Sequence, residues 1–201
     1  AKPDPKAQRN FTDPESRIMK DGATKAFEQA YNCQAAVDET AQVVVATNVT
    51  QQANDKQQVE PLIEDLKERN DGQTPGIVSA DSGYFSEQNI DYLQNENIDE
   101  YIATGRLKHG EENSSSSVSP PETLRPNATV KEKAAHKLRT TKGRCTYKKR
   151  KQIVEPVFGQ IKEIRGFGRF LLRGLDNVTA EWNLICLTHN LLKLFRYGTL
   201  E

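Results

Sequence analysis

The sequence has few cysteines and no long apolar run, and each absence excludes a class of protein. Only three cysteines, Cys33, Cys145 and Cys186, occur among the 201 residues, and no two of them form a Cys-x-x-Cys pair. This odd number argues against a disulfide framework and a zinc site, and favours the reduced thiols of a cytoplasmic protein. No apolar run is long enough to cross a membrane, and no signal peptide is present. We therefore expect a cytoplasmic protein without a membrane partner.

Hydrophobic residues are also scarce, at 35% of the chain. This fraction is low for a compact domain, so part of the chain is expected to lie outside the core. Residues 1–12 are polar and proline-rich and predict a disordered lead-in. Residues 105–145 are mostly rich in Ser, Pro and Glu and predict a flexible insertion, although 130–138 has the pattern of a short amphipathic helix. The rest of 13–201 predicts one domain.

The net charge of zero conceals a strong asymmetry. Residues 131–173 contain 14 Lys and Arg but only three acids, Glu132, Glu155 and Glu163, and the remainder of the chain carries the matching negative excess. A cationic segment on a neutral chain favours a polyanionic partner, of which nucleic acid is the commonest. The alternative is a basic segment that is merely solvated.

The order of apolar patterns predicts an α/β protein. Residues 27–38 and 42–49 read as two strands of a hairpin. A helix follows near 59–66, with Asp55 and Gln58 as a capping box and Pro61 causing either a kink or a late start. Residues 77–81 read as a short buried strand, Ser86 as the cap of a second helix, and residues 98–104 as another strand. This order implies a mixed sheet with partly parallel neighbours, flanked by helices.

Two further helices are expected towards the end of the sequence. Apolar residues recur at helical spacing over 153–161, and Pro156 must lie in the first turn or mark a kink. The last helix covers 178–197 and is capped by Asp176 or Asn177. Its apolar side chains surround most of its circumference, so it is expected to be largely buried.

Asp81 is the last residue of the predicted strand 77–81. In open α/β sheets, functional groups collect beyond the carboxyl ends of the strands. A carboxylate there, followed by Gly83 for a tight turn, can bind a hard cation through oxygen. The alternative is a turn-forming aspartate whose side chain caps the backbone amides that follow.

Glu155 is a lone acid next to four consecutive cations, Lys148 to Lys151. One interpretation is an ion pair with Lys151 within a helix. The other is a carboxylate that holds a divalent metal while the surrounding lysines hold phosphates. Acids at the centre and bases at the rim are what metal-assisted phosphoryl transfer requires.

Four segments together resemble a known family. "TDPESRIMK", "YNCQAAVDE", "SADSGYFSEQN" and "YKKRKQIVEPVFGQIKEIRGFGRFLLRGL" look like the C-terminal catalytic part of bacterial insertion-sequence transposases of the DDE type. The resemblance covers nearly the whole chain except 105–140. It implies a ribonuclease H-like mixed sheet, and cleavage and strand transfer of double-stranded transposon DNA with Mg²⁺ or Mn²⁺. It also implies a homodimer that acts in the bacterial cytoplasm, at the nucleoid.

The resemblance also assigns roles to individual residues. It makes Asp81 and Glu155 the second and third acids of the catalytic, metal-binding triad. It assigns DNA contacts to Tyr147, to Arg150 or Lys151, and to Lys162. The residues themselves add Arg165, Arg169 and Arg173, which lie on a glycine-rich loop and can clamp phosphates, unless this loop is simply solvated.

The sequence departs from this family in one respect. The members most like it carry the first acid in an Asp-Gly-Thr or Asp-Gly-Ser motif, which is absent here. The first acid then lies upstream of residue 1, or is Asp13 or Asp38. In the first case, we expect the first sheet strand to be missing and the chain alone to be inactive. The alternative function is that of a non-catalytic, nucleic-acid-binding fragment of a truncated transposase.

Overall fold

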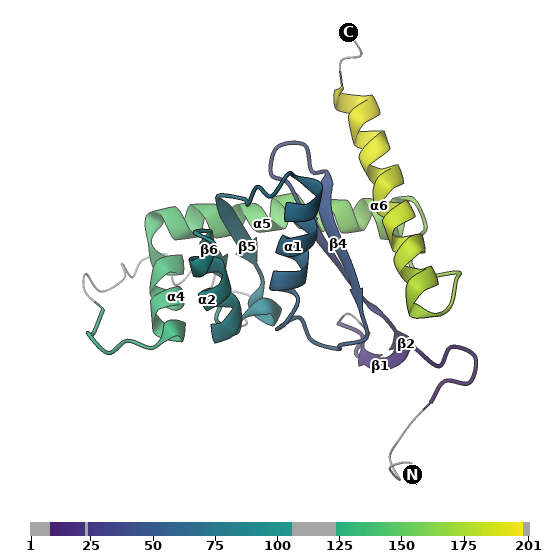
Figure 1. Ribbon diagram of the computed structural model, residues 1–201, viewed down its shortest axis with the longest axis horizontal. Helices are drawn as coiled ribbons and strands as arrows, with labels where there is room; N and C mark the ends of the chain where they lie inside the picture. Colours follow the sequence, from purple (N-terminus) through teal and green to yellow (C-terminus); the bar gives the residue numbers. More distant parts are fainter. Residues whose placement is uncertain (1–8, 23, 106–123, 199–201) are drawn as a thin grey trace. The chain divides into compact units, whose positions relative to one another are not determined.

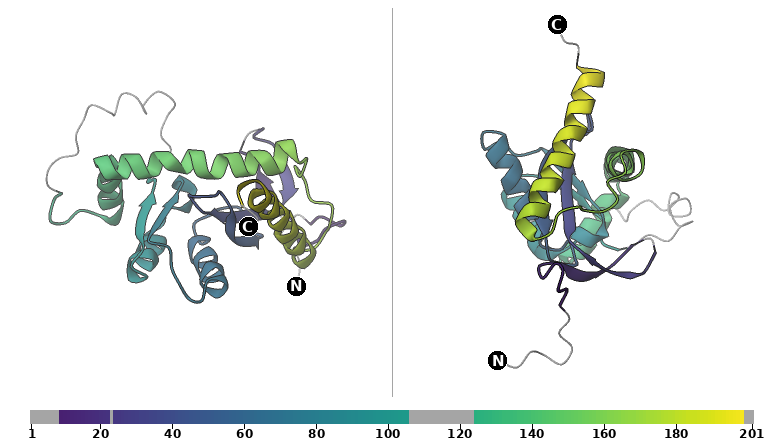
Figure 2. Two further views of the ribbon diagram at one scale, coloured as in Figure 1. Left: turned by 90° about the horizontal axis from the view of Figure 1, so that it is seen from above. Right: turned by 90° about the vertical axis from the view of Figure 1, so that its right-hand side faces the viewer.

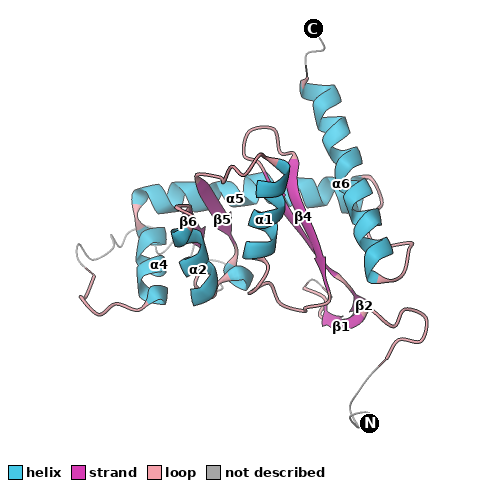
Figure 3. Cartoon of the chain, viewed as in Figure 1, coloured by secondary structure: helices cyan, strands magenta, loops and turns pink. Residues whose placement is uncertain are grey.

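The computed structural model describes residues 9–22, 24–105 and 124–198, and it has the expected mixed α/β composition (Figures 1 and 3). The described residues form two compact units. We call 1–54 together with 159–201 the hairpin unit, and 55–158 the α/β unit.

The hairpin unit contains two antiparallel strand pairs. β1 (Arg17–Lys20) pairs with β2 (Phe27–Ala30), and β3 (Asn32–Val37) pairs with β4 (Val44–Thr50). The β3–β4 pairing confirms the predicted hairpin. The segment predicted as one strand over 27–38 is two strands, because the chain changes its pairing partner at Tyr31.

One face of α6 (Leu175–Tyr197) packs on β4 in the hairpin unit (Figure 2, right). Trp182 is buried there and donates its indole N–H to the carbonyl of Gln34, at 3.0 Å. The side chain of Asn190 extends the edge of the hairpin by bonding both the N–H and the C=O of Val44, at 2.8 and 2.7 Å.

The opposite face of α6 is exposed. Leu184 and Leu194 are 60% and 61% accessible, and Leu187 and Leu191 between them are also exposed. The prediction of a largely buried helix was therefore wrong, because the described residues of this unit cover only one side of it. None of the described helices is long and apolar enough to span a bilayer.

The start of α6 also differs from the sequence prediction. The N-cap residue is Gly174, not Asp176 or Asn177, and a glycine has no side chain with which to cap the helix. Instead, Glu15 accepts a hydrogen bond from the backbone N–H of Leu175 at 2.7 Å. A carboxylate suits the positive end of a helix, and here it comes from a distant part of the sequence.

The α/β unit is built around a parallel strand pair. β5 (Ile77–Ala80) pairs in parallel with β6 (Asp99–Ile102), which confirms the expected parallel neighbours. Helices α1 (Val59–Arg69) and α2 (Glu87–Asn95) supply most of the core, with Ser86 capping α2 as predicted. The buried core residues are Val59, Ile63, Ile90, Leu93, Ile98 and Ile102.

Two features of this unit correct the sequence interpretation. β5 is only partly buried, with Ile77 exposed, because β6 is its only strand partner among the described residues. The predicted capping box of α1 does not form: Gln58 is the N-cap and makes no side-chain capping bond. Pro61 lies in the first turn of α1, where no intrahelical N–H is required, so the helix starts late and does not kink.

Part of the predicted insertion is helical. α4 (Val130–Arg139) begins with a Thr129–Glu132 capping box, and α5 (Thr141–Gly159) follows it directly. Lys137 ties this segment to β6, since its ammonium lies 2.8 Å from carboxylate oxygens of both Asp99 and Glu100. α4 confirms the short amphipathic helix expected over 130–138, and these ion pairs hold it against β6. Residues 106–123 lie outside the described part.

One of the two expectations for Pro156 in α5, a place in the first turn, is excluded. Pro156 lies near the end of this long helix and not in its first turn. The chain then forms a single π-helical turn, η3 (Gln160–Ile164), which belongs to the hairpin unit. Such turns are rare, and they occur frequently at functional sites.

Candidate functional site

Asp81 directly follows the last residue of β5. Its Oδ1 accepts a hydrogen bond from the N–H of Gly83 at 2.8 Å, which caps the short helix η1 (Ser82–Tyr84). The turn-forming interpretation is thus correct for one oxygen. The other, Oδ2, accepts no hydrogen bond from any described residue. Asp81 therefore shapes the turn and still has an oxygen available for a ligand.

Gly83 lies against two carboxylates. A Cβ atom at this position would be 2.9 Å from Oδ2 of Asp55 and 3.0 Å from Oδ1 of Asp81. Among the described glycines only Gly72, Gly166 and Gly174 have positive φ, so Gly83 does not need the left-handed conformation. Gly83 lies in the tight turn that follows Asp81, as predicted, and its missing side chain also leaves space for both carboxylates. The sequence predicts only a helix-capping role for Asp55.

The pKa of Tyr84 is affected by the charges around this turn. Burial raises the pKa of its hydroxyl, and the carboxylates of Asp55 and Asp81 raise it further, while Arg150 opposes them. Arg150 belongs to α5, so this helix brings a positive charge to the turn that contains Asp81. The guanidinium of Arg150 lies 5.5 Å from the centre of the Tyr147 ring. Its Nε atom is buried and has no hydrogen-bond partner among the described residues.

Glu155 lies on the same helix as Arg150. The two residues are five positions apart, which corresponds to a rise of about 7.5 Å along the helix axis. Glu155 is exposed and makes no hydrogen bond or ion pair with any described residue. The predicted alternative, an ion pair with Lys151, is therefore not formed. Six cations and this single acid make α5 a strongly basic helix with one available carboxylate.

A divalent ion can be tested against these side chains. In residues 9–22, 24–105 and 124–198, no three His, Cys, Asp or Glu side chains come together in a group suited to a metal. The structure brings Asp55 to Asp81 but does not group Glu155 with them. A pair of carboxylates nevertheless fits Mg²⁺, which is usually held by one or two carboxylates together with waters and substrate phosphates.

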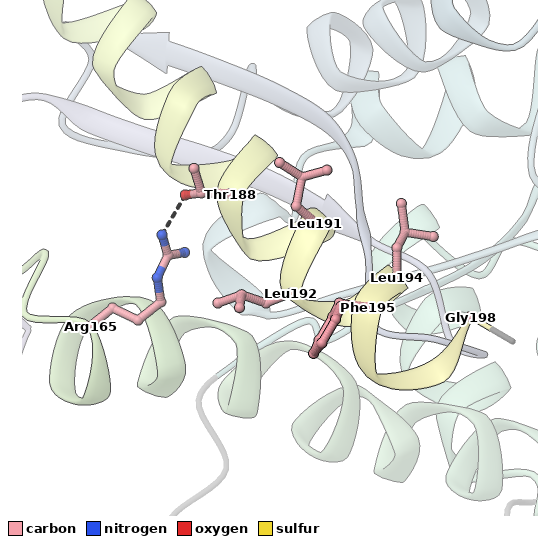
Figure 4. Close-up of a pocket in the computed structure, with 7 residues that line it drawn as sticks. All are labelled: Arg165, Thr188, Leu191, Leu192, Leu194, Phe195 and Gly198. Carbon is pink, nitrogen blue, oxygen red and sulfur yellow. Dashed lines mark hydrogen bonds between the residues drawn. The ribbon is translucent and has the colours of Figure 1, made fainter. Parts of the chain in front are cut away.

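The residues predicted to contact DNA have different surroundings. Arg165 is engaged inside the hairpin unit: it donates to the carbonyl of Ile185 at 3.2 Å and to the hydroxyl of Thr188, beside an apolar hollow along α6 (Figure 4). Arg165 thus has a structural task. The other predicted cations of this unit are exposed, namely Lys162, Arg169 and Arg173, and so is Lys151 of the α/β unit.

The two internal candidates for the first acid have both carboxylate oxygens occupied. Asp13 is 8% accessible and accepts hydrogen bonds from the hydroxyl of Tyr31, at 2.8 and 2.9 Å, and from the N–H of Gly174, at 3.2 Å. The carboxylate of Asp38 caps the β3–β4 turn by accepting from the backbone N–H groups of Thr40, Ala41 and Val43. These contacts favour structural roles for both residues.

The described residues thus form an α/β protein in which a carboxylate directly follows a parallel strand and a cationic helix carries an exposed glutamate. The comparison with protein families gives the particular class: residues 5–191 match the family described as "Transposase DDE domain". The chain belongs to this family, whose members carry out transposition reactions on DNA and generally use divalent metal ions. Searches of curated proteins and of solved structures give no match.

Proposed function

We propose that this chain is the catalytic part of a transposase that cleaves insertion-sequence DNA ends and transfers their strands. Family membership supports the class of reaction. The observation that carries the proposal is the state of Glu155, an exposed carboxylate without a partner among the described residues, on the same cationic helix whose Arg150 acts on the Asp81 turn. An acid that only stabilised α5 would be paired with one of the neighbouring lysines.

In this proposal, Asp81 and Glu155 hold Mg²⁺ or Mn²⁺. The bound ion supplies charge stabilisation at the scissile phosphate and lowers the pKa of the attacking water or 3′-hydroxyl. Tyr147, Lys151 and Lys162 position the DNA backbone. Arg150 is the better candidate for the middle base of the predicted signature, because its guanidinium lies over Tyr147 and its charge reaches the turn.

We further propose that β5 and β6 belong to a ribonuclease H-like sheet whose first strand and first acid precede residue 1. Two observations support this arrangement. The second edge of β5 has no strand partner among the described residues, and an unpaired edge readily accepts another strand. Asp13 and Asp38 already use their oxygens. We expect the intact enzyme to be a homodimer in a bacterial cytoplasm.

Nicking of supercoiled DNA that carries the ends of the element tests the proposal. The chain extended upstream to include the first acid should nick this DNA in the presence of Mn²⁺, and Asp81→Asn and Glu155→Gln in that protein should each remove the activity. Asp91→Asn is a matched control, because Asp91 is an exposed acid on α2 of the same unit. Nicking that persists in both test variants would reject the site assignment. Strand-transfer products would separate a transposase from another nuclease of the same fold.

The alternative is a fragment that binds DNA without cutting it. One observation favours it: among the described residues, Glu155 is not grouped with the acids at the β5 end. DNA binding should then depend steeply on salt, because lysines and arginines release counterions from the phosphates. Equal affinity of the wild type, Asp81→Asn and Glu155→Gln, together with an absence of nicking, would support this second function.

A further inference from the structure

A row of exposed leucines on α6 has no part in the proposed chemistry. We propose that this face of α6 binds the same face of α6 in a second copy of the chain, with the two helices antiparallel. The expected homodimer does not by itself specify a surface. Every residue that supports this surface belongs to the hairpin unit, so it stands or falls independently of the metal site.

The row consists of four leucines that are each more than half exposed, namely Leu184, Leu187, Leu191 and Leu194. The opposite side of α6 carries Trp182 and His189, which are buried and bonded to the hairpin. Beside the row, Phe195 is 79% accessible. Single exposed apolar residues are normal on a protein surface, but a contiguous apolar patch marks an interaction site.

The row carries no charge. Between Glu181 and Arg196, the only Lys, Arg, Asp or Glu is Lys193, which is buried and donates a hydrogen bond to the side chain of Gln42 at 2.8 Å. A helix face that is merely solvated normally carries charged and polar residues. A face that binds DNA would carry lysines and arginines. The composition of this row therefore fits an apolar protein partner.

The spacing of the row indicates that this partner is a helix. The four leucines are three, four and three positions apart, which is the spacing of a coiled-coil seam. Ala180 and Gly198 extend the pattern by four positions at either end, and both are small and exposed. A seam of this kind packs against the equivalent seam of another helix.

The pattern is the same when it is read from either end, and this symmetry points to a second copy of α6. In an antiparallel pair, Leu184 lies opposite Leu194 of the second copy, and Leu187 lies opposite Leu191 of the second copy. A two-fold interface requires such a self-complementary surface, whereas an unrelated partner does not. The antiparallel orientation also places the positive end of each helix beside the negative end of the other.

An apolar hollow along α6 lies beside the row. Its lining includes Leu192 and Phe195, together with Arg165, which donates to the hydroxyl of Thr188 (Figure 4). In the antiparallel pair, this C-terminal half of α6 lies opposite the N-terminal half of the second α6. The hollow can then receive the side chain of Leu184 from the second copy, as a knob enters a hole in a coiled coil.

The size of the row limits the strength of the contact. From residue 180 to residue 198 it is about 27 Å long, and a helix is about 10 Å wide. Interfaces of less than about 1,200 Å² in total are typically weak and transient, and the contact of two such strips belongs to this class. We therefore expect a dimer that dissociates in the micromolar range and not a permanent one.

Analytical ultracentrifugation of the whole chain without DNA tests the proposal. The average mass should rise from that of a monomer towards that of a dimer as the concentration increases through the micromolar range. Leu187→Glu combined with Leu191→Glu places like charges opposite each other and should weaken the dimer at least about 10-fold. Ile18→Glu is the matched control, because Ile18 is an exposed apolar residue on β1 of the same unit, and it should leave the dimer unchanged. Circular dichroism verifies that each variant is folded.

Disulfide cross-linking tests the orientation of the helices and does not depend on the glutamate variants. Both chains carry Cys145→Ser, because Cys145 is an exposed thiol. When a mixture of the Leu184→Cys and Leu194→Cys chains is oxidised by air, it should form a mixed disulfide dimer. Each chain alone should form far less cross-linked product.

Three results would overturn the proposal. A chain that stays monomeric at every concentration would mean that a different partner, or another part of a longer protein, covers the row. A dimer that the double glutamate variant leaves unchanged would place the interface elsewhere. Efficient cross-linking of the Leu194→Cys chain with itself would indicate parallel helices. None of these measurements uses metal or DNA cleavage, so their failure would leave the catalytic proposal to its own test.

Discussion

The acids of the hairpin unit and those of the α/β unit differ in what their oxygens contact. Asp13 and Asp38 each accept hydrogen bonds on both oxygens, from a half-buried hydroxyl or from backbone amides. Asp81 uses one oxygen, and Glu155 uses neither, among the described residues. All four were candidates for one catalytic triad. The difference indicates that the first pair maintains the fold, whereas the second pair is available for ligands.

Among these four acids, the largest effect of a substitution on activity is expected for Glu155→Gln. We predict a loss of metal-dependent nicking of about 10³-fold, because a neutral amide cannot replace a charged metal ligand or stabilise the developing charge. The melting temperature should not change, since Glu155 is exposed and has no partner to lose among the described residues. A clear fall in melting temperature would show that Glu155 is structural, like the hairpin acids.

Asp13→Ala should have the opposite pattern. It leaves the hydroxyl of Tyr31 and the N–H of Gly174 without their acceptor, at a cost of about 2–4 kcal/mol of folding free energy. Burial and the neighbouring carboxylate of Asp13 raise the pKa of Tyr31, in line with a protonated donor. Tyr31→Phe removes only one of these donors and should cost about 1 kcal/mol. Urea unfolding measures both variants.

A different result for Asp13→Ala would contradict the structural role assigned to Asp13. Stability close to that of the wild type, combined with weaker Mn²⁺ binding, would make Asp13 the missing first acid after all. The same two measurements on Asp38→Asn would then examine the remaining internal candidate.

Gly83→Ala is expected to have an intermediate effect. A methyl group would collide with the ends of Asp55 and Asp81, and we expect a loss of about 1–2 kcal/mol in stability, as in an overpacked site. Mn²⁺ affinity should fall as well, because both carboxylates must move apart. Gly76→Ala is the matched control, since no described atom lies within 4 Å of the point that its Cβ would occupy. Equal stability of the two variants would contradict the close approach at Gly83.

Much of the fold followed from local patterns in the sequence. The β3–β4 hairpin, the parallel β5–β6 pair and the cap of α2 at Ser86 all depend on residues that are close together or strongly periodic. The start of α6 did not follow from a local pattern. Glu15, from the far end of the sequence, accepts the hydrogen bond of a backbone N–H in its first turn. The exposed face of α6 also escaped prediction, since hydrophobicity alone does not reveal which side finds a partner.

The candidate site was only partly predictable for the same reason. Asp81 stood out because an acid directly after an apolar run marks the end of a strand. Asp55 has the sequence context of a helix cap, and only the folded chain places its carboxylate on Gly83. No local signal in the sequence predicts a contact between residues 55 and 83.

The smallest effect concerns His189, which is buried under the hairpin and donates from Nε2 to the carbonyl of Gln42 at 3.1 Å. Burial lowers its pKa, and the charges of Lys193 and Arg165 lower it further, although the bond to Gln42 opposes them. The unfolded chain therefore binds a proton more readily at this position. The contribution of His189 to stability is complete above the unfolded pKa of about 6.5 and is lost as the pH falls through the folded value. Urea unfolding of His189→Gln should lack this component of acid sensitivity, and an unchanged profile would mean that the imidazole has the same pKa in the folded and the unfolded chain.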